Sequence, residues 1–359
     1  MSELKQCRLG DVISFGNGKS RPVSEGSIPV YGGNGILGYC ADHNYDGETI
    51  VIGRVGAYCG ATYYENKPIW ISDNALSAKP KGQNNTKFYY YYLKDMDLNQ
   101  YAGGSSHPLV TQTLLNSLDI SIQDNPEEQK AIASVLSSLD DKIDLLHRQN
   151  TTLEAMAETL FRQWFVEEAQ EDWDEGTLKD EFNFTMGQSP AGSSFNEDGL
   201  GVPMFQGNAD FGFRFPSERI YTTEPARFAE PMDTLISVRA PVGAQNMAKI
   251  KCCIGRGVAA FRYKFNRGFY TYTYFKLRSL MEEIKKFNDE GTVFGSISKS
   301  DFENLVTTIP TDKDVFKFEL EAKPLNDKII NNCEQIQTLE KLRDNLLPKL
   351  MSDEVRVKP

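Results

Sequence analysis

Between residues 125 and 166 the sequence carries a heptad pattern, the feature that most constrains how this chain can fold. The pattern continues over about 40 residues, so a helix with a rise of about 1.5 Å per residue would be roughly 60 Å long. Asn125-Pro126-Glu127-Glu128 suits the start of such a helix, with a capping Asn, a Pro at the first helical position and acidic residues at the positive end of the dipole. The two apolar seams consist of Leu136, Ile143, Asn150, Ala157 and Trp164, and of Ile132, Leu139, Leu146, Leu153 and Leu160.

A single long core helix would show the same pattern, but a second copy near the C-terminus favours a paired arrangement. Asp141-Lys142-Ile143 recurs as Asp327-Lys328-Ile329, and residues 152–154 recur as 338–340. Polar seam residues usually fix the register of paired helices. We therefore predict two long antiparallel coiled-coil helices in a chain with an internal repeat. The second seam consists of Ile329, Ile336, Leu339, Leu346 and Leu350, and the polar seam residues are Asn150, Asn332 and Arg343.

The segments outside these helices read as two diverged copies of a strand-rich globule. Short apolar runs alternate with turns in residues 1–124, with helical stretches expected at 87–94 and 111–116 and a strand at 118–122. The same plan returns in residues 169–310, where the sequence aligns 28–34 with 202–208 and 48–54 with 233–239. We predict an α+β fold with a pseudo-twofold repeat: domains 1–124 and 169–310, a central helix 125–168, and a C-terminal helix with a tail, 311–359. Thr311 would cap the second helix, but Pro324 would kink it or end its first turn, which leaves its start open.

Charge is distributed unevenly along the chain. The formal net charge is −11, and residues 124–176 contain 14 acidic but only 4 basic side chains. Residues 234–281 contain no acidic side chain and nine basic ones, which would suit a phosphate backbone. The acidic helix would then face a protein. A solvated charged surface remains the alternative for both regions.

The sequence favours a non-catalytic, cytoplasmic protein. No apolar run resembles a signal peptide or a membrane span. Six cysteines without Cys-x-x-Cys spacing and three histidines indicate free thiols and no zinc site. Residues 33–38 fit G-x-G-x-x-G, but no helix-forming run follows them, so a dinucleotide site is rejected. No nucleophile, paired carboxylate or metal constellation is supported.

Taken together, the repeated plan resembles the specificity subunit of a Type I restriction-modification system over essentially the whole chain. The resemblance rests on 9–11, on 49–54 with its counterpart 233–239, on the helix start Pro126-Glu127-Glu128-Gln129 and on 152–161. In that family each globule is a target-recognition domain and the helices form a spacer. The resemblance implies recognition of a bipartite double-stranded DNA target and assembly with two DNA adenine methyltransferase subunits, with nuclease-translocase subunits as further partners. S-adenosylmethionine, ATP and Mg²⁺ would belong to those partners, and this chain would hold no cofactor.

Two other interpretations stay open from the sequence. One is a structural adaptor with two β-rich binding modules on a coiled-coil strut. The other is a specificity subunit of a modification-only system, which differs only in lacking a nuclease partner.

Candidate DNA-contacting residues are polar or basic residues in Gly-rich loops, where the backbone can approach the bases closely. Arg54 and Arg239 rank first because the repeat aligns them at the end of a strand, although a structural ion pair would also explain them. The first globule offers Lys19, Ser20, Arg21, Asn34, Arg54, Tyr58, Ser105, Ser106 and His107. The second offers Gln188, Ser189, Gln206, Asn208, Arg239, Thr292 and Ser296. The expected partner-binding and coiled-coil residues are Leu136, Leu139, Ile143, Leu146, Asn150, Leu153, Leu160, Trp164, Ile329, Ile336, Leu339 and Leu346.

Overall fold

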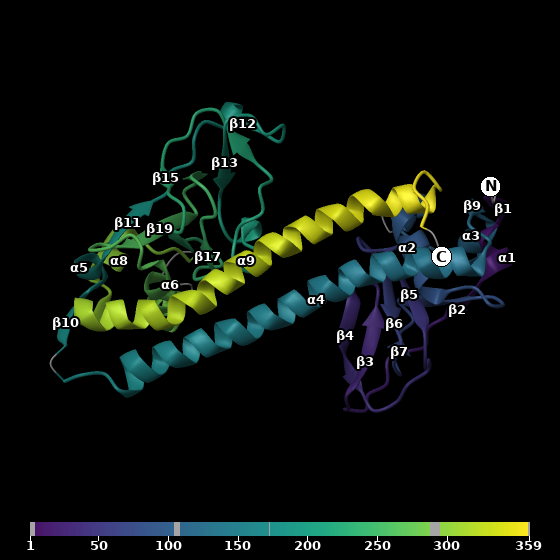
Figure 1. The fold of residues 1–359 in the computed structure, drawn as a ribbon, viewed down its shortest axis with the longest axis horizontal. Coiled ribbons are helices and arrows are strands. Elements are labelled where there is room, and N and C mark those ends of the chain that lie inside the picture. Colours follow the sequence, from purple (N-terminus) through teal and green to yellow (C-terminus); the bar gives the residue numbers. More distant parts are fainter. Residues whose placement is uncertain (1–3, 104–107, 172, 288–294, 358–359) are drawn as a thin grey trace. The chain divides into compact units, whose positions relative to one another are not determined.

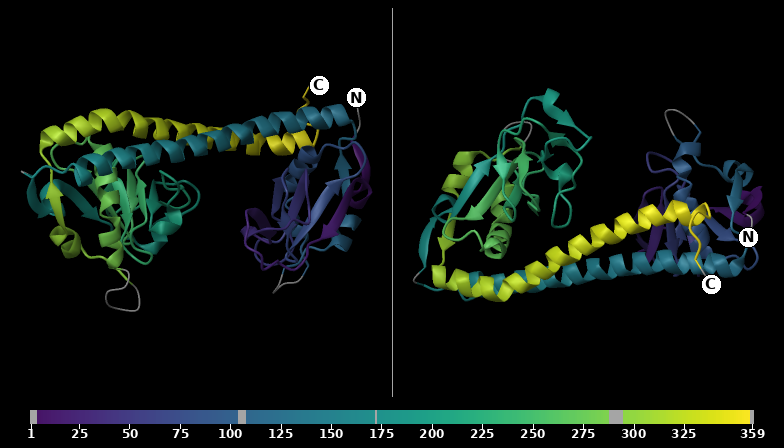
Figure 2. Two further views of the ribbon diagram at one scale, coloured as in Figure 1. Left: turned by 90° about the horizontal axis from the view of Figure 1, so that it is seen from below. Right: turned by 45° about the horizontal axis from the view of Figure 1, so that its top comes forward.

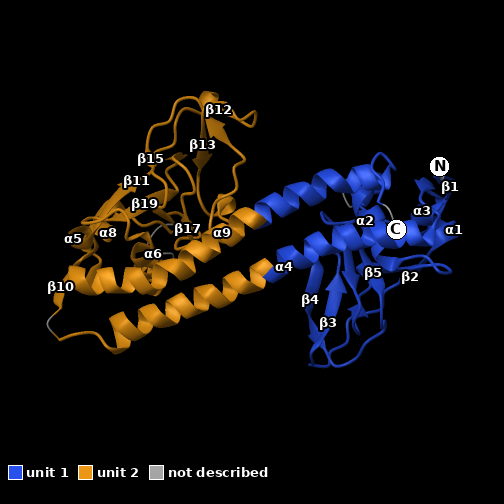
Figure 3. Ribbon diagram, in the orientation of Figure 1, with its two compact units in different colours: residues 1–145, 336–359 blue, residues 146–335 orange. Residues whose placement is uncertain are grey.

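A computed structural model describes residues 4–103, 108–171, 173–287 and 295–357. The chain divides into two compact units, residues 1–145 with 336–359 (unit 1) and residues 146–335 (unit 2), as Figure 3 shows by colour. Two long helices, α4 (Pro126–Arg162) and α9 (Asp312–Met351), each contribute residues to both units. The prediction of a mixed α+β fold with two long helices is therefore confirmed.

The globular part of unit 1 contains three small sheets (Figure 1). Two are antiparallel throughout, whereas β3 pairs with β7 in parallel. The strand orders are β1 (Lys5–Arg8) with β9 (Asp119–Ile122); β2 (Ile13–Asn17), β8 (Ala75–Pro80), β5 (Thr49–Gly53) and β6 (Thr62–Glu65); and β4 (Gly35–Cys40), β3 (Ile28–Gly32) and β7 (Trp70–Ile71).

The helices of this globule lie where the sequence predicts them. α2 (Thr86–Asp95) begins at the cap Asn85, whose side chain accepts the Phe88 N–H at 2.9 Å. The short α3 (Gln112–Ser117) is capped in the same way by Thr111, which accepts the Leu114 N–H at 3.1 Å. Two further short elements are α1 (Leu9–Val12) and the 3₁₀ turn η1 (Leu98–Tyr101).

The globular part of unit 2 repeats this plan, but the sheet that corresponds to β4, β3 and β7 has five strands instead of three. β13 pairs with β18 in parallel, as β3 does with β7 in unit 1. The strand orders are β10 (Asp174–Thr177) with β20 (Val306–Ile309); β11 (Phe182–Met186), β19 (Val258–Tyr263), β16 (Thr234–Ser237) and β17 (Gln245–Met247); and β12 (Phe195–Asn196), β14 (Tyr221–Thr222), β13 (Val202–Phe205), β18 (Cys252–Ile254) and β15 (Phe228–Ala229). The helices are α5 (Leu178–Glu181), α6 (Tyr270–Ser279), α7 (Met281–Lys286) and α8 (Lys299–Asn304), with 3₁₀ turns η3 (Gly192–Ser194) and η4 (Asn208–Asp210).

The start of α4 agrees with the capping prediction. The Asn125 Oδ1 accepts the Glu127 N–H at 3.0 Å, and Pro126 occupies the first helical position. Within each unit, α4 and α9 run antiparallel and lie side by side (Figures 1 and 2). In unit 1, Leu136 shares a core with Leu347, and in unit 2 Phe161 packs edge-on against Phe318, with ring centroids 5.4 Å apart.

One predicted seam is confirmed as far as Ala157, because Leu136, Ile143, Asn150 and Ala157 are all buried and only Trp164 is partly buried. In the other seam Ile132 and Leu146 are buried, but Leu139, Leu153 and Leu160 are only partly buried. An α-helix of 3.6 residues per turn drifts by about 20° per heptad, so a strict seven-residue repeat leaves the contact face. The residues that follow Leu153, Leu160 and Trp164 are buried in their place: Glu154, Phe161 and Phe165, the last lying in the π-helical turn η2 (Gln163–Glu167).

Pro324 was expected to kink the second helix or to end its first turn. It does not end the helix, because α9 is continuous from Asp312 to Met351. Pro324 is exposed, as is Leu320, whose carbonyl loses its helical donor. Water can satisfy that carbonyl, so only one hydrogen bond of a 40-residue helix is lost. Thr311 caps the helix as predicted, accepting the Asp314 N–H at 3.3 Å.

Candidate nucleic-acid interface

In unit 2, four loops at neighbouring strand ends form one surface around Arg256. The turn from β18 to β19 is closed by the Val258 N–H, which donates to the Gly255 carbonyl at 3.0 Å. The loop after β11 docks on it, since the Gln188 N–H donates to the Ile254 carbonyl at 3.0 Å and the Arg256 N–H donates to the Ser189 Oγ at 3.2 Å.

The loops after β13 and β16 join the same surface. The Gly255 N–H donates to the Phe205 carbonyl at 2.8 Å, and the Val238 N–H donates to the Gly257 carbonyl at 2.9 Å. Close approach requires glycine here, because a Cβ built on Gly257 would lie 2.1 Å from the Gln206 carbonyl oxygen. Most of these contacts between the loops are made by the backbone, which leaves side chains such as Arg239 and Arg256 available for a ligand.

The structure brings together six of the seven residues predicted for this unit. Arg239, Gln206 and Asn208 line one hollow with Arg256, and Arg239 and Ser296 line an adjoining hollow with it. Gln188 and Ser189 lie in the loop that contacts Arg256. The seventh, Thr292, lies outside the described residues.

Two arginines of this surface have no counter-ion among the described residues. Arg239 and Arg256 are exposed, and neither guanidinium has an ion pair with any residue in the described ranges. The third arginine at the rim, Arg219, pairs with Asp210, whose carboxylate also accepts the Gln206 N–H at 2.7 Å and so fixes the loop. An ion pair within the described part of the chain therefore does not explain Arg239.

The acid-free stretch 234–281 does not form one basic patch, contrary to the simplest reading of the sequence. Arg262 binds Asp233 through two contacts, and burial raises the pKa of that carboxyl. Lys276 is buried and donates to the Thr308 carbonyl at 2.7 Å, and burial lowers the pKa of its amine. Acidic and carbonyl groups from other segments thus neutralise or hold several of these cations, while Arg239 and Arg256 are exposed on the loop surface without an ion pair to a described residue.

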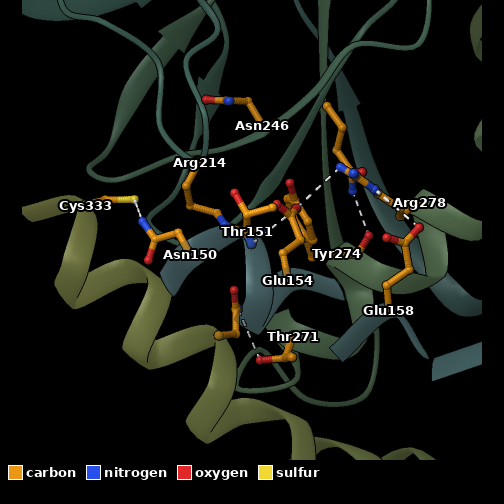
Figure 4. A network of polar contacts seen from close by, with 12 residues as sticks. Asn150, Thr151, Glu154, Glu158, Arg214, Asn246, Thr271, Tyr274, Arg278 and Cys333 are labelled. Atoms are coloured by element: carbon orange, nitrogen blue, oxygen red, sulfur yellow. Dashed lines mark hydrogen bonds and ion pairs between the residues drawn. The ribbon is translucent and has the colours of Figure 1, made fainter. Parts of the chain in front are cut away.

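Arg278 belongs instead to a buried network that fastens this globule to α4 (Figure 4). The guanidinium of Arg214 is fully buried, with its Cζ 3.9 Å from the Tyr274 ring centroid and its Nη2 3.5 Å from the Glu154 Oε1. Arg278 reaches the same carboxylate oxygen at 3.4 Å and Glu158 at 3.8 Å. This network holds the globule against α4, and none of its residues lines the two hollows around Arg256.

Unit 1 builds the corresponding loops with the same hydrogen bonds. The Ala75 N–H donates to the Ser72 carbonyl at 3.0 Å, which closes the turn from β7 to β8. The Lys19 N–H donates to the Ile71 carbonyl at 3.0 Å, and the Ser72 N–H donates to the Tyr31 carbonyl at 2.8 Å. Each bond has its counterpart in unit 2, so the turn residue Asp73 takes the place of Arg256.

This register corrects the pairing of Arg54 with Arg239. The Arg54 N–H donates to the Asn74 carbonyl at 2.9 Å, as the Val238 N–H does to Gly257. Arg54 therefore corresponds to Val238, and Val55 to Arg239. The sequence alignment was off by one position because two apolar strands can be slid past each other without losing their pattern, whereas hydrogen bonds fix the register.

The other residues predicted in unit 1 lie at or near these loops. Lys19, Ser20, Arg21, Asn34 and Tyr58 are exposed, and Arg54 is partly buried without an ion pair to a described residue. Ser105, Ser106 and His107 lie outside the described residues. Sequence reasoning missed Asp73 and did not single out Arg256, although the flanking Gly255 and Gly257 mark the latter as a turn residue.

None of the described helices is both long enough and apolar enough to span a membrane. Within residues 4–103, 108–171, 173–287 and 295–357, no cluster of His, Cys, Asp and Glu could hold a metal ion. All six cysteines are free thiols.

Comparisons with known proteins agree with the resemblance drawn from the sequence. Residues 1–155 match the family model for the Type I restriction modification DNA specificity domain. A putative type I restriction enzyme MjaX specificity subunit from Methanocaldococcus jannaschii is 31% identical over 319 residues, covering 82% of this chain and 75% of the relative. The MjaIX specificity subunit of the same organism is 27% identical over 325 residues, covering 81% and 74%.

A solved structure has the same fold. The Type I restriction-modification S subunit from M. genitalium aligns with a TM-score of 0.69 at 20% identity, covering 98% of this chain and 97% of that one. With this fold, this loop surface and these relatives, the chain belongs to the family of type I restriction-modification specificity subunits. As a member it is a DNA-recognition subunit without catalysis of its own, and the structural adaptor considered above is set aside.

Proposed function

We propose that this chain reads a bipartite double-stranded DNA target with two target-recognition domains, residues 1–124 and 169–310. The observation that carries the proposal is the repeated loop scaffold: the same backbone hydrogen bonds in each unit display different exposed side chains. A constant scaffold with variable side chains is what two readers of different half-sites need. The exposed guanidinium groups of Arg239 and Arg256 suit contacts with DNA.

The long helices then serve as the spacer and as the platform for two DNA adenine methyltransferase subunits. The solvent-exposed face of α4 carries Glu127, Asp141, Asp144 and Glu158. Such an acidic face repels a phosphate backbone and suits a protein partner. S-adenosylmethionine would be held by the methyltransferase subunits, and ATP and Mg²⁺ by nuclease-translocase subunits where the system includes them.

The test is co-expression with a cognate methyltransferase subunit, followed by mapping of methylated adenines across the host DNA. We expect one motif with two specified parts and a fixed gap. Replacing residues 177–310 by those of a relative should change one part of the motif and leave the other and the gap intact. A continuous motif, or a swap that changes both parts, would contradict the division into two readers.

Complex formation tests the platform separately. A stable complex without methylation would argue against recognition by these domains. Failure of the two chains to copurify would argue against the proposed role of the long helices.

A further inference from the structure

The turns 72–74 and 255–257 are the same piece of scaffold carrying opposite charges. In each, the first residue of the turn accepts the N–H of the residue three positions on, at 3.0 Å in both units. In each, the same residue donates its N–H to a carbonyl of the neighbouring parallel strand, that of Tyr31 in unit 1 and of Phe205 in unit 2, at 2.8 Å in both units. Asp73 and Arg256 therefore occupy equivalent positions, and both are exposed.

The neighbouring loop also differs in charge between the units, and in unit 1 its charge is opposite to that of the turn residue. Lys19 and Gln188 are equivalent, since their N–H groups donate to the equivalent carbonyls of Ile71 and Ile254, each at 3.0 Å. Unit 1 thus places an aspartate beside a loop that carries a lysine, and unit 2 places an arginine beside a loop that carries a glutamine. No hydrogen bond or ion pair to another described residue occupies either turn side chain.

Opposite charge at one position decides between two kinds of DNA contact. A phosphate contact requires a donor or a cation, so Asp73 would repel the backbone at the place where Arg256 would attract it. Base edges offer partners for both: arginine binds the O6 and N7 of guanine, and aspartate accepts from the amino group of cytosine. Only base contacts suit both side chains.

We infer that the residue at this turn position determines base specificity in each of the two domains. Arg256 reads a guanine in the half-site of residues 169–310, and Asp73 reads a cytosine amino group in the half-site of residues 1–124. The inference rests on the proposed function and names the base chemistry at one position of each half-site.

The experiment compares methylation motifs of complexes that contain the wild-type chain, Arg256→Ala or Arg256→Lys. Arg256→Ala should accept other base pairs at one G·C position of one half-site, with discrimination falling about ten- to a hundredfold. Arg256→Lys should retain part of that discrimination, because lysine also reaches guanine O6 and N7. The matched control Arg267→Ala removes an exposed arginine of unit 2 that lines other hollows, and should leave the motif unchanged.

Asp73→Asn provides the parallel test in unit 1. It should relax one G·C position in the other half-site, whereas Asp119→Asn, an exposed aspartate in β9, should have no effect. Because both turn side chains are exposed, the variants should melt at the wild-type temperature.

The outcomes separate the inference from the proposed function. A wild-type bipartite motif that stays unchanged in Arg256→Ala and Asp73→Asn overturns the inference and leaves the proposed function standing. A relaxed A·T position overturns the assignment of guanine or cytosine. A uniform loss of methylation at every site, with all positions still specified, would indicate a phosphate contact and also overturn it. A wild-type complex that yields no bipartite motif overturns both.

Discussion

Asn332 of α9 donates its Nδ2–H to the Oδ1 of Asn150 in α4 at 2.8 Å, and both side chains are fully buried. The Asn332 Oδ1 has no hydrogen-bond partner in the described part of the chain. A buried polar pair in an apolar seam costs stability but disfavours other registers of the two helices. The pair therefore fixes the alignment of α4 against α9 in unit 2.

Replacing one partner should be worse than replacing both. Asn150→Leu leaves the Asn332 amide buried without its acceptor, so we expect a loss of about 1–3 kcal/mol in the free energy of unfolding. Adding Asn332→Leu should recover most of that loss, because two apolar side chains need no partner. Urea denaturation of the two single variants and the double variant measures the coupling. Additive losses would show that the amide pair contributes nothing specific.

Because Arg214 is buried, loss of the Glu154 carboxylate should lower the free energy of unfolding more than loss of the Glu158 carboxylate. In Glu154→Gln the guanidinium of Arg214 loses the only carboxylate that it contacts among the described residues, while it remains 1% exposed. Breaking such a pair from one side costs about 3–5 kcal/mol. Glu158→Gln is the matched control, one helical turn away on α4. Its side chain is 54% exposed and meets Arg278 at 3.8 Å, so its loss should stay below about 1 kcal/mol. Equal melting temperatures for the two variants would contradict this account of the network.

Gly257 should be sensitive to the addition of a single methyl group. Gly257→Ala places a Cβ 2.1 Å from the Gln206 carbonyl oxygen, so the two loops must separate. We expect a lower melting temperature together with weaker discrimination in one half-site, measured on the methylating complex. Gly192→Ala is the control in the same unit, because a Cβ there would meet no atom within 4 Å. If Gly257→Ala behaves like Gly192→Ala, the loops do not depend on this contact.

Local signals predicted the helices well, because caps and periodicity act within a few residues. The Asn125 cap and the Thr311 cap form as expected. Beyond Asn150 the prediction is right for Ala157 but one position early at Leu153, Leu160 and Trp164, because helical drift accumulates with distance along the helix.

The candidate surface was harder to predict, since its residues come from strand ends far apart in the sequence. Gln188, Gln206 and Arg239 were chosen for their residue types and Gly-rich context, and the fold brings their loops together. Asp73 carries no local signal of its own. Its significance depends on equivalence with Arg256, which only the hydrogen-bond register shows.

Pro324 offers a route to a more stable α9. The residue is exposed within a continuous helix, so its ring contributes little packing while it removes one backbone hydrogen bond. Proline in a helix interior is about 3 kcal/mol less favourable than alanine, and we expect Pro324→Ala to recover about 1–3 kcal/mol of that. Thermal melting of the purified chain checks this, with Lys328→Ala as the control at an exposed position one turn further on, where the change should stay within about 0.5 kcal/mol. A lower melting temperature for Pro324→Ala would contradict this expectation. It would mean that the bend or the restricted backbone imposed by proline stabilises α9 in its present conformation.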